Sequence, residues 1–243
     1  MGRASALLTP RWIAFAAIAI ALVAYYALVD RLWEAPLWWD IAWLDLVLMP
    51  AVFALVYLAL PAWRSRGLGV LTLAFALLAV AFEVEDVEVA ANFAKLAAVT
   101  AGAWWFLTFF ESLAWVVMIA SIIPFVDGYS VWRGPTHHIV TKRQDVFSAL
   151  SFAFPAPGDL GSANLGLPDL LFFALFLAST ARWGLRTFAT WVAMVASFGV
   201  TMALAVGLEV TGLPALPLLS IAFLAANADL LWRRYRRREP VPG

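Results

Sequence analysis

The sequence predicts an all-α fold: a polytopic transmembrane helical bundle of about eight spans, with nine possible. Hydrophobic residues make up 64% of the 243 residues and charged residues only 13%, and the mean hydropathy is +0.88. Apolar runs long enough, or nearly so, to cross about 30 Å of hydrocarbon recur along the whole chain. Runs of this length are typical of membrane helices, because the strands of a membrane barrel need only about ten residues each.

The eight predicted spans divide into two groups of four. The first group lies within residues 1–111 and the second within residues 112–243, which also contain a predicted external loop at 132–164. The first span has an 18-residue apolar core, longer than that of a usual signal peptide, so we expect it to be retained. The predicted spans are 12–29, 41–61, 68–82, 89–110, 113–131, 165–181, 187–208 and 213–232.

The distribution of basic residues predicts the orientation in the membrane. With an even number of spans, eleven of the sixteen lysines and arginines fall on the side of the two termini, four fall on the other side, and Lys95 lies within a span. Cytoplasmic loops carry the excess of basic residues, so both termini are expected in the cytoplasm and the 132–164 loop outside. Many of the thirteen tryptophans stand beside polar turns, as in the aromatic belts where a protein meets the lipid bilayer.

Two acids stand out in the second half of the chain. Asp127 lies four residues before the end of its apolar run, and Asp169 lies four residues after the start of the next. In antiparallel neighbouring helices both carboxyl groups would lie roughly 6 Å inside the same face of the membrane. The last span begins at that face with Pro214 and Pro217, which free backbone groups there. A carboxylate within a membrane costs about 3 kcal/mol, so this pair is a candidate functional site.

The chemistry expected of such a pair follows from charge. Two facing carboxyl groups in a low-dielectric site cannot both ionise, so one serves as a base and the other as an acid. The base can activate a water molecule against a peptide carbonyl while the acid donates a proton to the carbonyl oxygen. A transmembrane substrate would first have to unwind, and its freed backbone could pair with the external loop or with the start of the last span.

The second half of the sequence resembles a known protein family. The likeness is to the presenilin and signal peptide peptidase group of intramembrane aspartyl proteases, particularly its small prokaryotic members, and it covers residues 112–232. The motifs that carry it are Asp127 followed by Tyr129-Ser130-Val131, then Gly166-Leu167-Pro168-Asp169, and Pro214-Ala215-Leu216.

The resemblance implies roles for these residues. Asp127 and Asp169 would be the catalytic pair of an endopeptidase without cofactor or metal. Substrate would bind beside them, at Gly166 and Pro168 and at Pro214, Ala215 and Leu216. The implied substrates are membrane-anchored peptides or proteins, and the implied location is a prokaryotic plasma membrane.

The sequence departs from the family pattern at two positions. Val126 precedes the first acid where the family has tyrosine, and Pro168 precedes the second where the family has glycine. Proline suits the first turn of a helix, so a helix starting near Leu167 would hold Asp169 in its first turn. Proline also allows a substrate backbone less close approach than glycine does. An active protease and an inactive scaffold that binds membrane helices therefore both remain open.

The sequence also suggests an alternative function and contains several further polar residues. A proton-coupled transporter or channel would favour paired repeats, and the sequence contains none. Asp45, Lys95 and Glu111 are expected to be structural or interfacial, and Asp229 to be a paired interface residue. The His137-His138 pair is expected in a loop rather than at a metal, since adjacent side chains point apart. The segment 147–154 is either a short interfacial helix or a re-entrant strand. The arginines from 233 to 238 are expected to anchor anionic lipid rather than nucleic acid, and the oligomeric state stays open.

Overall fold

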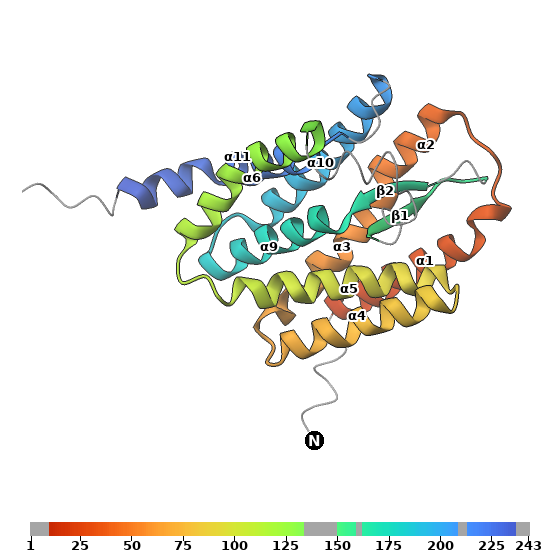
Figure 1. The fold of residues 1–243 in the computed structure, drawn as a ribbon, viewed down its shortest axis with the longest axis horizontal. Helices are drawn as coiled ribbons and strands as arrows, with labels where there is room; N and C mark the ends of the chain where they lie inside the picture. Colours follow the sequence, from red (N-terminus) through yellow and green to blue (C-terminus); the bar gives the residue numbers. More distant parts are fainter. Residues whose placement is uncertain (1–9, 134–149, 159–161, 209–212, 237–243) are drawn as a thin grey trace, which may run out of the picture.

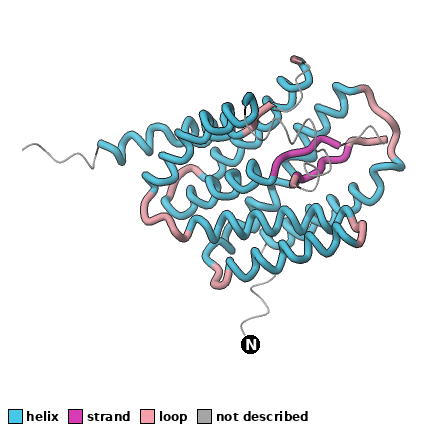
Figure 2. Tube along the Cα trace, viewed as in Figure 1, coloured by secondary structure: helices cyan, strands magenta, loops and turns pink. Residues whose placement is uncertain are grey.

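The computed structural model describes residues 10–133, 150–158, 162–208 and 213–236. Most helices run roughly along the long axis of the molecule, and a small β-hairpin lies among them toward one end (Figures 1 and 2). In chain order the elements of the first half are α1 (Pro10–Leu28), η2 (Val29–Arg31), α2 (Leu37–Trp43), η3 (Leu44–Leu48), α3 (Met49–Ala59), η4 (Leu60–Arg64), α4 (Leu68–Val84) and α5 (Glu88–Leu107). Those of the second half are α6 (Leu113–Arg133), β1 (Ser151–Pro155), β2 (Ser162–Gly166), α9 (Leu167–Trp183), α10 (Thr187–Gly207) and α11 (Leu216–Arg236).

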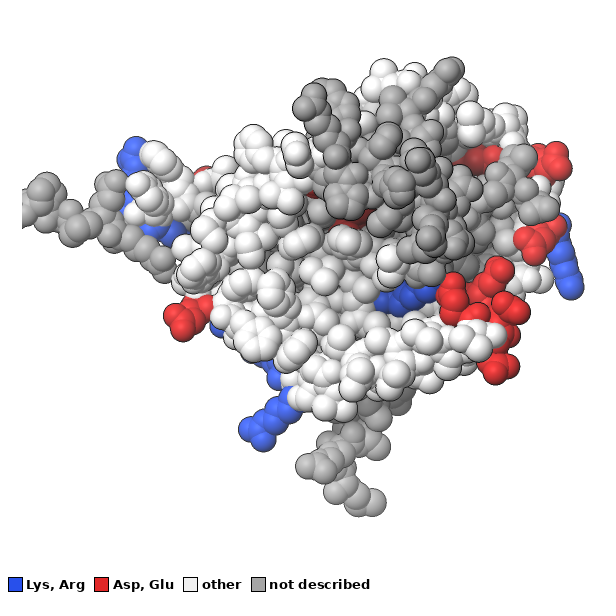
Figure 3. Space-filling view, viewed as in Figure 1, with Lys and Arg blue, Asp and Glu red and all other residues white. Residues whose placement is uncertain are grey.

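The helical membrane character predicted from the sequence is confirmed, but the number of spans is not. Within the described ranges, four helical stretches are long and apolar enough to cross a membrane: Pro10–Arg31, Leu37–Arg64, Thr187–Gly207 and Leu216–Arg236. Two shorter apolar helices are Leu68–Val84 and Leu113–Tyr129. On the face shown in Figure 3, most charged side chains lie toward the two ends of the molecule and the surface between them is largely uncharged.

The all-α prediction is wrong for the segment before Asp169. Strands β1 and β2 form an antiparallel hairpin, with Ser151 opposite Gly166 and Pro155 opposite Ser162. The strand alternative for residues 147–154 is therefore confirmed for the part that the structure describes. Because β2 continues directly into α9, the helix begins at Leu167 rather than at Leu165 and is 17 residues long.

Side chains from two other helices close the outer edge of β1. Asn92 of α5, which is buried, accepts a hydrogen bond from the Ala153 N–H at 2.9 Å and donates one to its carbonyl at 2.8 Å. The hydroxyl of Tyr26 donates to the same carbonyl, and that of Tyr25 donates to the Pro155 carbonyl, both at 2.9 Å. An edge strand buried in an apolar bundle needs such partners, since its backbone groups cannot reach water.

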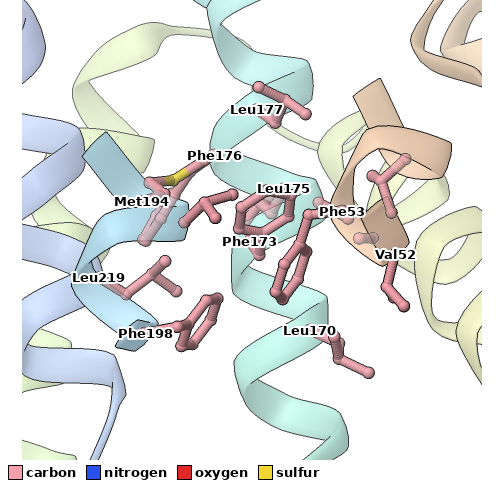
Figure 4. Close-up of a cluster of buried hydrophobic side chains, with 14 of the residues drawn as sticks. Val52, Phe53, Leu170, Phe173, Leu175, Phe176, Leu177, Met194, Phe198 and Leu219 are labelled. Carbon is pink, nitrogen blue, oxygen red and sulfur yellow. The ribbon is translucent and has the colours of Figure 1, made fainter. Parts of the chain in front are cut away.

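Helix α9 is the centre of the hydrophobic core. Its residues from Phe173 to Thr180 are all buried, and aromatic rings from three other helices pack against it (Figure 4). Phe53 of α3 lies 4.2 Å from Phe173 between ring centroids, and Phe223 of α11 stacks on Phe176 at 4.8 Å. The core therefore fixes the helix that carries Asp169 at its start.

The polar residues expected to be structural or interfacial have different surroundings. Lys95, which is largely buried, forms an ion pair with Glu83 at 2.8 Å between nitrogen and oxygen. Asp229 is paired as expected, at 2.8 Å and on the surface, but its partner is Arg186 and not Arg233, which is nearer in sequence. Asp45 lies in the π-helical turn η3 just before Pro50, where it packs against Gly199 of α10.

The Asn92 bridge generates a prediction about stability. Replacing Asn92 by Leu should lower the free energy of unfolding by about 2 kcal/mol, because the Ala153 N–H loses its acceptor inside an apolar bundle. Thermal or denaturant unfolding of the purified protein measures this difference. Ser121→Ala is the control, since the Ser121 hydroxyl bonds only to the Val117 carbonyl one turn earlier on an exposed surface. Equal small losses in both variants would show that Asn92 does not hold the hairpin.

Candidate functional site

The two acids predicted from the sequence meet where α6 ends and α9 begins. Asp127 lies six residues before the end of α6, and Asp169 lies in the first turn of α9. The two carboxyl groups are close enough to interact electrostatically. Both are only partly exposed, and α6 and α9 are in contact. The structure thus brings together the two residues that the sequence singled out by their depth.

Asp169 owes its position to the way β2 turns into α9. Gly166 is the N-terminal cap of the helix, and its backbone N–H donates a hydrogen bond to the Asp169 carboxylate three residues later. A Cβ atom on residue 166 would lie 3.1 Å from Oδ2 of Asp169, a tighter approach than nine in ten real contacts of this kind. Glycine is therefore the residue that lets the carboxyl group fold back over the start of the helix.

Asp127 has a similar contact with another helix. Its carboxylate accepts a hydrogen bond from the backbone N–H of Leu216, the first residue of α11. Helix N-termini expose unpaired N–H groups and carry partial positive charge, so they stabilise a carboxylate. This contact places the predicted Pro214-Ala215-Leu216 element beside the acids, with Ala215 and Leu216 buried.

Pro168 sits at an early position in the first turn of α9, where a residue needs no N–H to continue the helix. Its side chain is exposed. The helix starts at Leu167, so Asp169 falls in its first turn, the arrangement that proline at position 168 allows. Proline in this place starts the helix without disturbing its hydrogen bonds.

The arrangement leaves one oxygen of the Asp127 carboxyl group without a hydrogen bond from the described residues. Oδ2 of Asp127 is buried and has no hydrogen-bond partner among the residues that the structure describes. A buried oxygen of this kind can share a proton with a second carboxyl group or hold a water molecule. No group of three or more His, Cys, Asp or Glu side chains that could hold a metal ion lies within the described ranges.

Other residues of the predicted motifs lie apart from the acids or outside the description. Val126 and Tyr129 are exposed, with 60% and 69% of their surface accessible. His137 and His138 lie outside the described residues. Ser220, fully buried one turn into α11, has a hydroxyl with no partner in the described part of the chain, and the sequence analysis did not single it out. A lone serine in an apolar run gives little signal of such a position.

The two hydrogen bonds to the acids predict opposite effects of two substitutions at Asp127. Asp127→Asn keeps an oxygen for the Leu216 N–H and removes the repulsion from Asp169, so the free energy of unfolding should rise by about 1 kcal/mol. Asp127→Ala leaves that N–H without an acceptor and should lower it by about 1 kcal/mol. Thermal unfolding at pH 7 measures both changes.

The control for this pair is Glu111→Gln, which removes an exposed acid just before α6. It should change the free energy of unfolding by less than about 0.5 kcal/mol. Destabilisation by Asp127→Asn as large as that by Asp127→Ala would mean that the negative charge, not the acceptor oxygen, holds α11.

Comparison with known proteins adds no identity to this geometry. No model of a protein family matches the chain, and no curated protein matches it either. The likeness to presenilin and signal peptide peptidase therefore stays a prediction from the motifs. The chemistry that the site can perform therefore follows from the positions of its own residues.

Proposed function

We propose that the protein is an intramembrane aspartyl protease that hydrolyses peptide bonds of membrane-anchored substrates with Asp127 and Asp169. The observation that carries the proposal is the packing of α6 on the start of α9, which brings these two partly buried carboxyl groups close enough to interact electrostatically. Buried acid pairs are rare outside functional sites, since each charge loses its hydration. The motif resemblance around both acids points to the same chemistry.

In the proposed reaction the two acids share one proton. The ionised carboxylate removes a proton from a water molecule, and the water oxygen attacks the peptide carbonyl carbon. The protonated carboxyl group donates its proton to the carbonyl oxygen, which gives a tetrahedral diol without a covalent enzyme intermediate. Proton transfer to the leaving nitrogen then breaks the C–N bond. The helix-start N–H groups of Gly166 and Leu216 keep both acids oriented throughout.

The hairpin suggests how an unwound substrate would be held. In β1 the N–H and carbonyl of Ala153 point to Asn92, so in the antiparallel register the backbone of its partner Asn164 points away from β1. The outer edge of β1 is closed, whereas β2 leads straight to Gly166 and Asp169. An extended substrate segment paired along β2 would pass beside the acids.

The proposal includes eight spans with both termini in the cytoplasm. Arginines at the proposed cytoplasmic end cap the C-terminal carbonyls of helices: Arg182 donates to Leu107 at 2.5 Å, and Arg234 donates to Trp183 at 2.5 Å. Cations at helix C-termini complement the helix dipole, so these contacts support one basic end for α5 and α9. The acids would then face the outer leaflet.

A second candidate is an inactive scaffold that binds membrane helices. The observation that favours it is that each carboxyl group already accepts a hydrogen bond from a helix start, which is a structural role in itself. Pro168 in place of the family's glycine fits the same reading. Only an activity measurement separates the two functions.

The proposal predicts cleavage of a generic transmembrane reporter peptide by the purified protein. Cleavage should be weak in the wild type, follow a bell-shaped pH profile, and fall by about 100-fold or more in Asp127→Asn and in Asp169→Asn. Both variants keep the fold, as their unfolding temperatures will show. Glu111→Gln should cleave like the wild type.

Pro168→Gly serves as a further arm of the same assay. We expect it to raise cleavage modestly, since glycine allows closer approach of the substrate backbone. If the protein folds but releases no fragments with proline or with glycine at position 168, the result would favour the scaffold function. Loss of proton-coupled transport in the Asn variants, without peptide fragments from any form, would instead identify a transporter.

The eight-span topology predicts where reporters fused to the chain will lie. A reporter after Arg238 and one between Arg64 and Leu68 should both be cytoplasmic, and one between Val84 and Glu88 should be external. Activity of compartment-specific fusions in cells measures this. An external reporter after Arg238 would mean an odd number of spans and an inverted site.

A further inference from the structure

The described structure holds an apolar groove at the end opposite the acids. We call it the α6–α11 groove; it has a volume of about 780 Å³ and lies between the start of α6 and the last turns of α11. Leu113, Val117 and Met118 form one wall, and Ala228 and Leu231 form the other. Asp127 and Leu216 meet at the far ends of the same two helices, roughly 20 Å away at 1.5 Å per residue.

Aromatic and basic side chains collect at the outer end of this groove. Trp183, Trp232, Arg234 and Tyr235 also line the groove, and Trp232 and Tyr235 are more than half exposed. Figure 1 shows α6 and α11 alongside each other at this end of the molecule. Tryptophan, tyrosine and arginine are the residues that lie at the level of lipid headgroups.

The charge around the groove is positive. Five described arginines lie at or beside the ends of α9, α10 and α11, and the acids nearby among the described residues are Glu111 and Asp229, the second of which pairs with Arg186. The guanidinium of Arg236 lies 5.0 Å from the Trp232 ring centroid, and Arg234 is oriented by its bond to the Trp183 carbonyl. The arginines are Arg182, Arg186, Arg233, Arg234 and Arg236.

We infer that the α6–α11 groove binds an anionic phospholipid, with acyl chain along the apolar walls and phosphate at Arg234. The volume falls within the range of about 300–1,000 Å³ typical of small-molecule sites. A helix about 10 Å wide would find room for fewer than two turns in it, so a partner helix fits less well. Arginine pairs with phosphate through two parallel hydrogen bonds. A zwitterionic headgroup carries its own cation, which weakens the attraction of its phosphate to arginine. The site does not depend on the acids or on the proposed function.

Native mass spectrometry of the full-length protein, titrated with phosphatidylglycerol or phosphatidylcholine, tests this site. The wild type should retain one phosphatidylglycerol with at least about ten-fold higher affinity than phosphatidylcholine. Arg234→Gln removes the charge and Ala228→Phe fills the groove, and each should abolish that preference or weaken binding about ten-fold. Ala228 is exposed, so either change is expected to leave the fold intact.

Two matched variants serve as controls. Arg64→Gln removes another exposed arginine, far along the chain from the groove, and Ala225→Phe adds a ring at another exposed position of α11. Both should bind phosphatidylglycerol like the wild type. The proposal would be overturned if the protein bound the two lipids with equal affinity, or if the control variants weakened binding as much as the groove variants do. It would also be overturned if inorganic phosphate competed for the site as well as the lipid does. So would a dimer that Ala228→Phe dissociates, since a second chain would then fill the groove.

Discussion

Contacts between carboxylates and helix starts organise the second half of this protein. Asp169 accepts the Gly166 N–H at the start of α9, and Asp127 accepts the Leu216 N–H at the start of α11. In an apolar environment each contact stabilises both partners, because an ionised carboxyl group and an unpaired N–H group of a helix end both cost free energy when they are buried without a hydrogen bond. The Asp127 contact joins α6 to α11, and the electrostatic interaction between Asp127 and Asp169 brings the start of α9 to the same point.

The hairpin and the phenylalanine core make this point rigid. Asn92, Tyr25 and Tyr26 hold β1 against α1 and α5, and β2 passes without a loop into the first turn of α9. The remainder of α9 is buried, with Phe173 packed against Phe53. An acid pair that must share a proton or position a water molecule needs such support, since small displacements weaken proton transfer.

Much of the site could be predicted from the sequence, and the reasons for the misses are physical. The depth of Asp127 and Asp169 follows from helix rise alone, and Pro168 marks the helix start correctly because proline fits the first turn. The sequence does not distinguish a strand from a short helix at Ser151–Pro155, because a short apolar run suits both. The role of Asn92 depends on a backbone 61 residues away, and the groove beside Arg234 depends on how α6 packs on α11, so neither has a local signal. Length and composition predict eight spans, whereas four described helical stretches are long and apolar enough to cross a membrane, since polar residues such as Lys95 and the strand before Leu167 interrupt the other apolar runs.

The central claim is that Asp127 and Asp169 act as one pair, and a double-mutant cycle tests it most directly. The free energy of unfolding is measured for Asp127→Asn, Asp169→Asn and the double variant at pH 7. Each single change removes the same repulsion, so the account predicts that the double variant gains less than the sum, by about 1 kcal/mol. Glu111→Gln combined with Asp169→Asn should be additive. Additivity of the Asp127 and Asp169 changes within about 0.3 kcal/mol would contradict the pair.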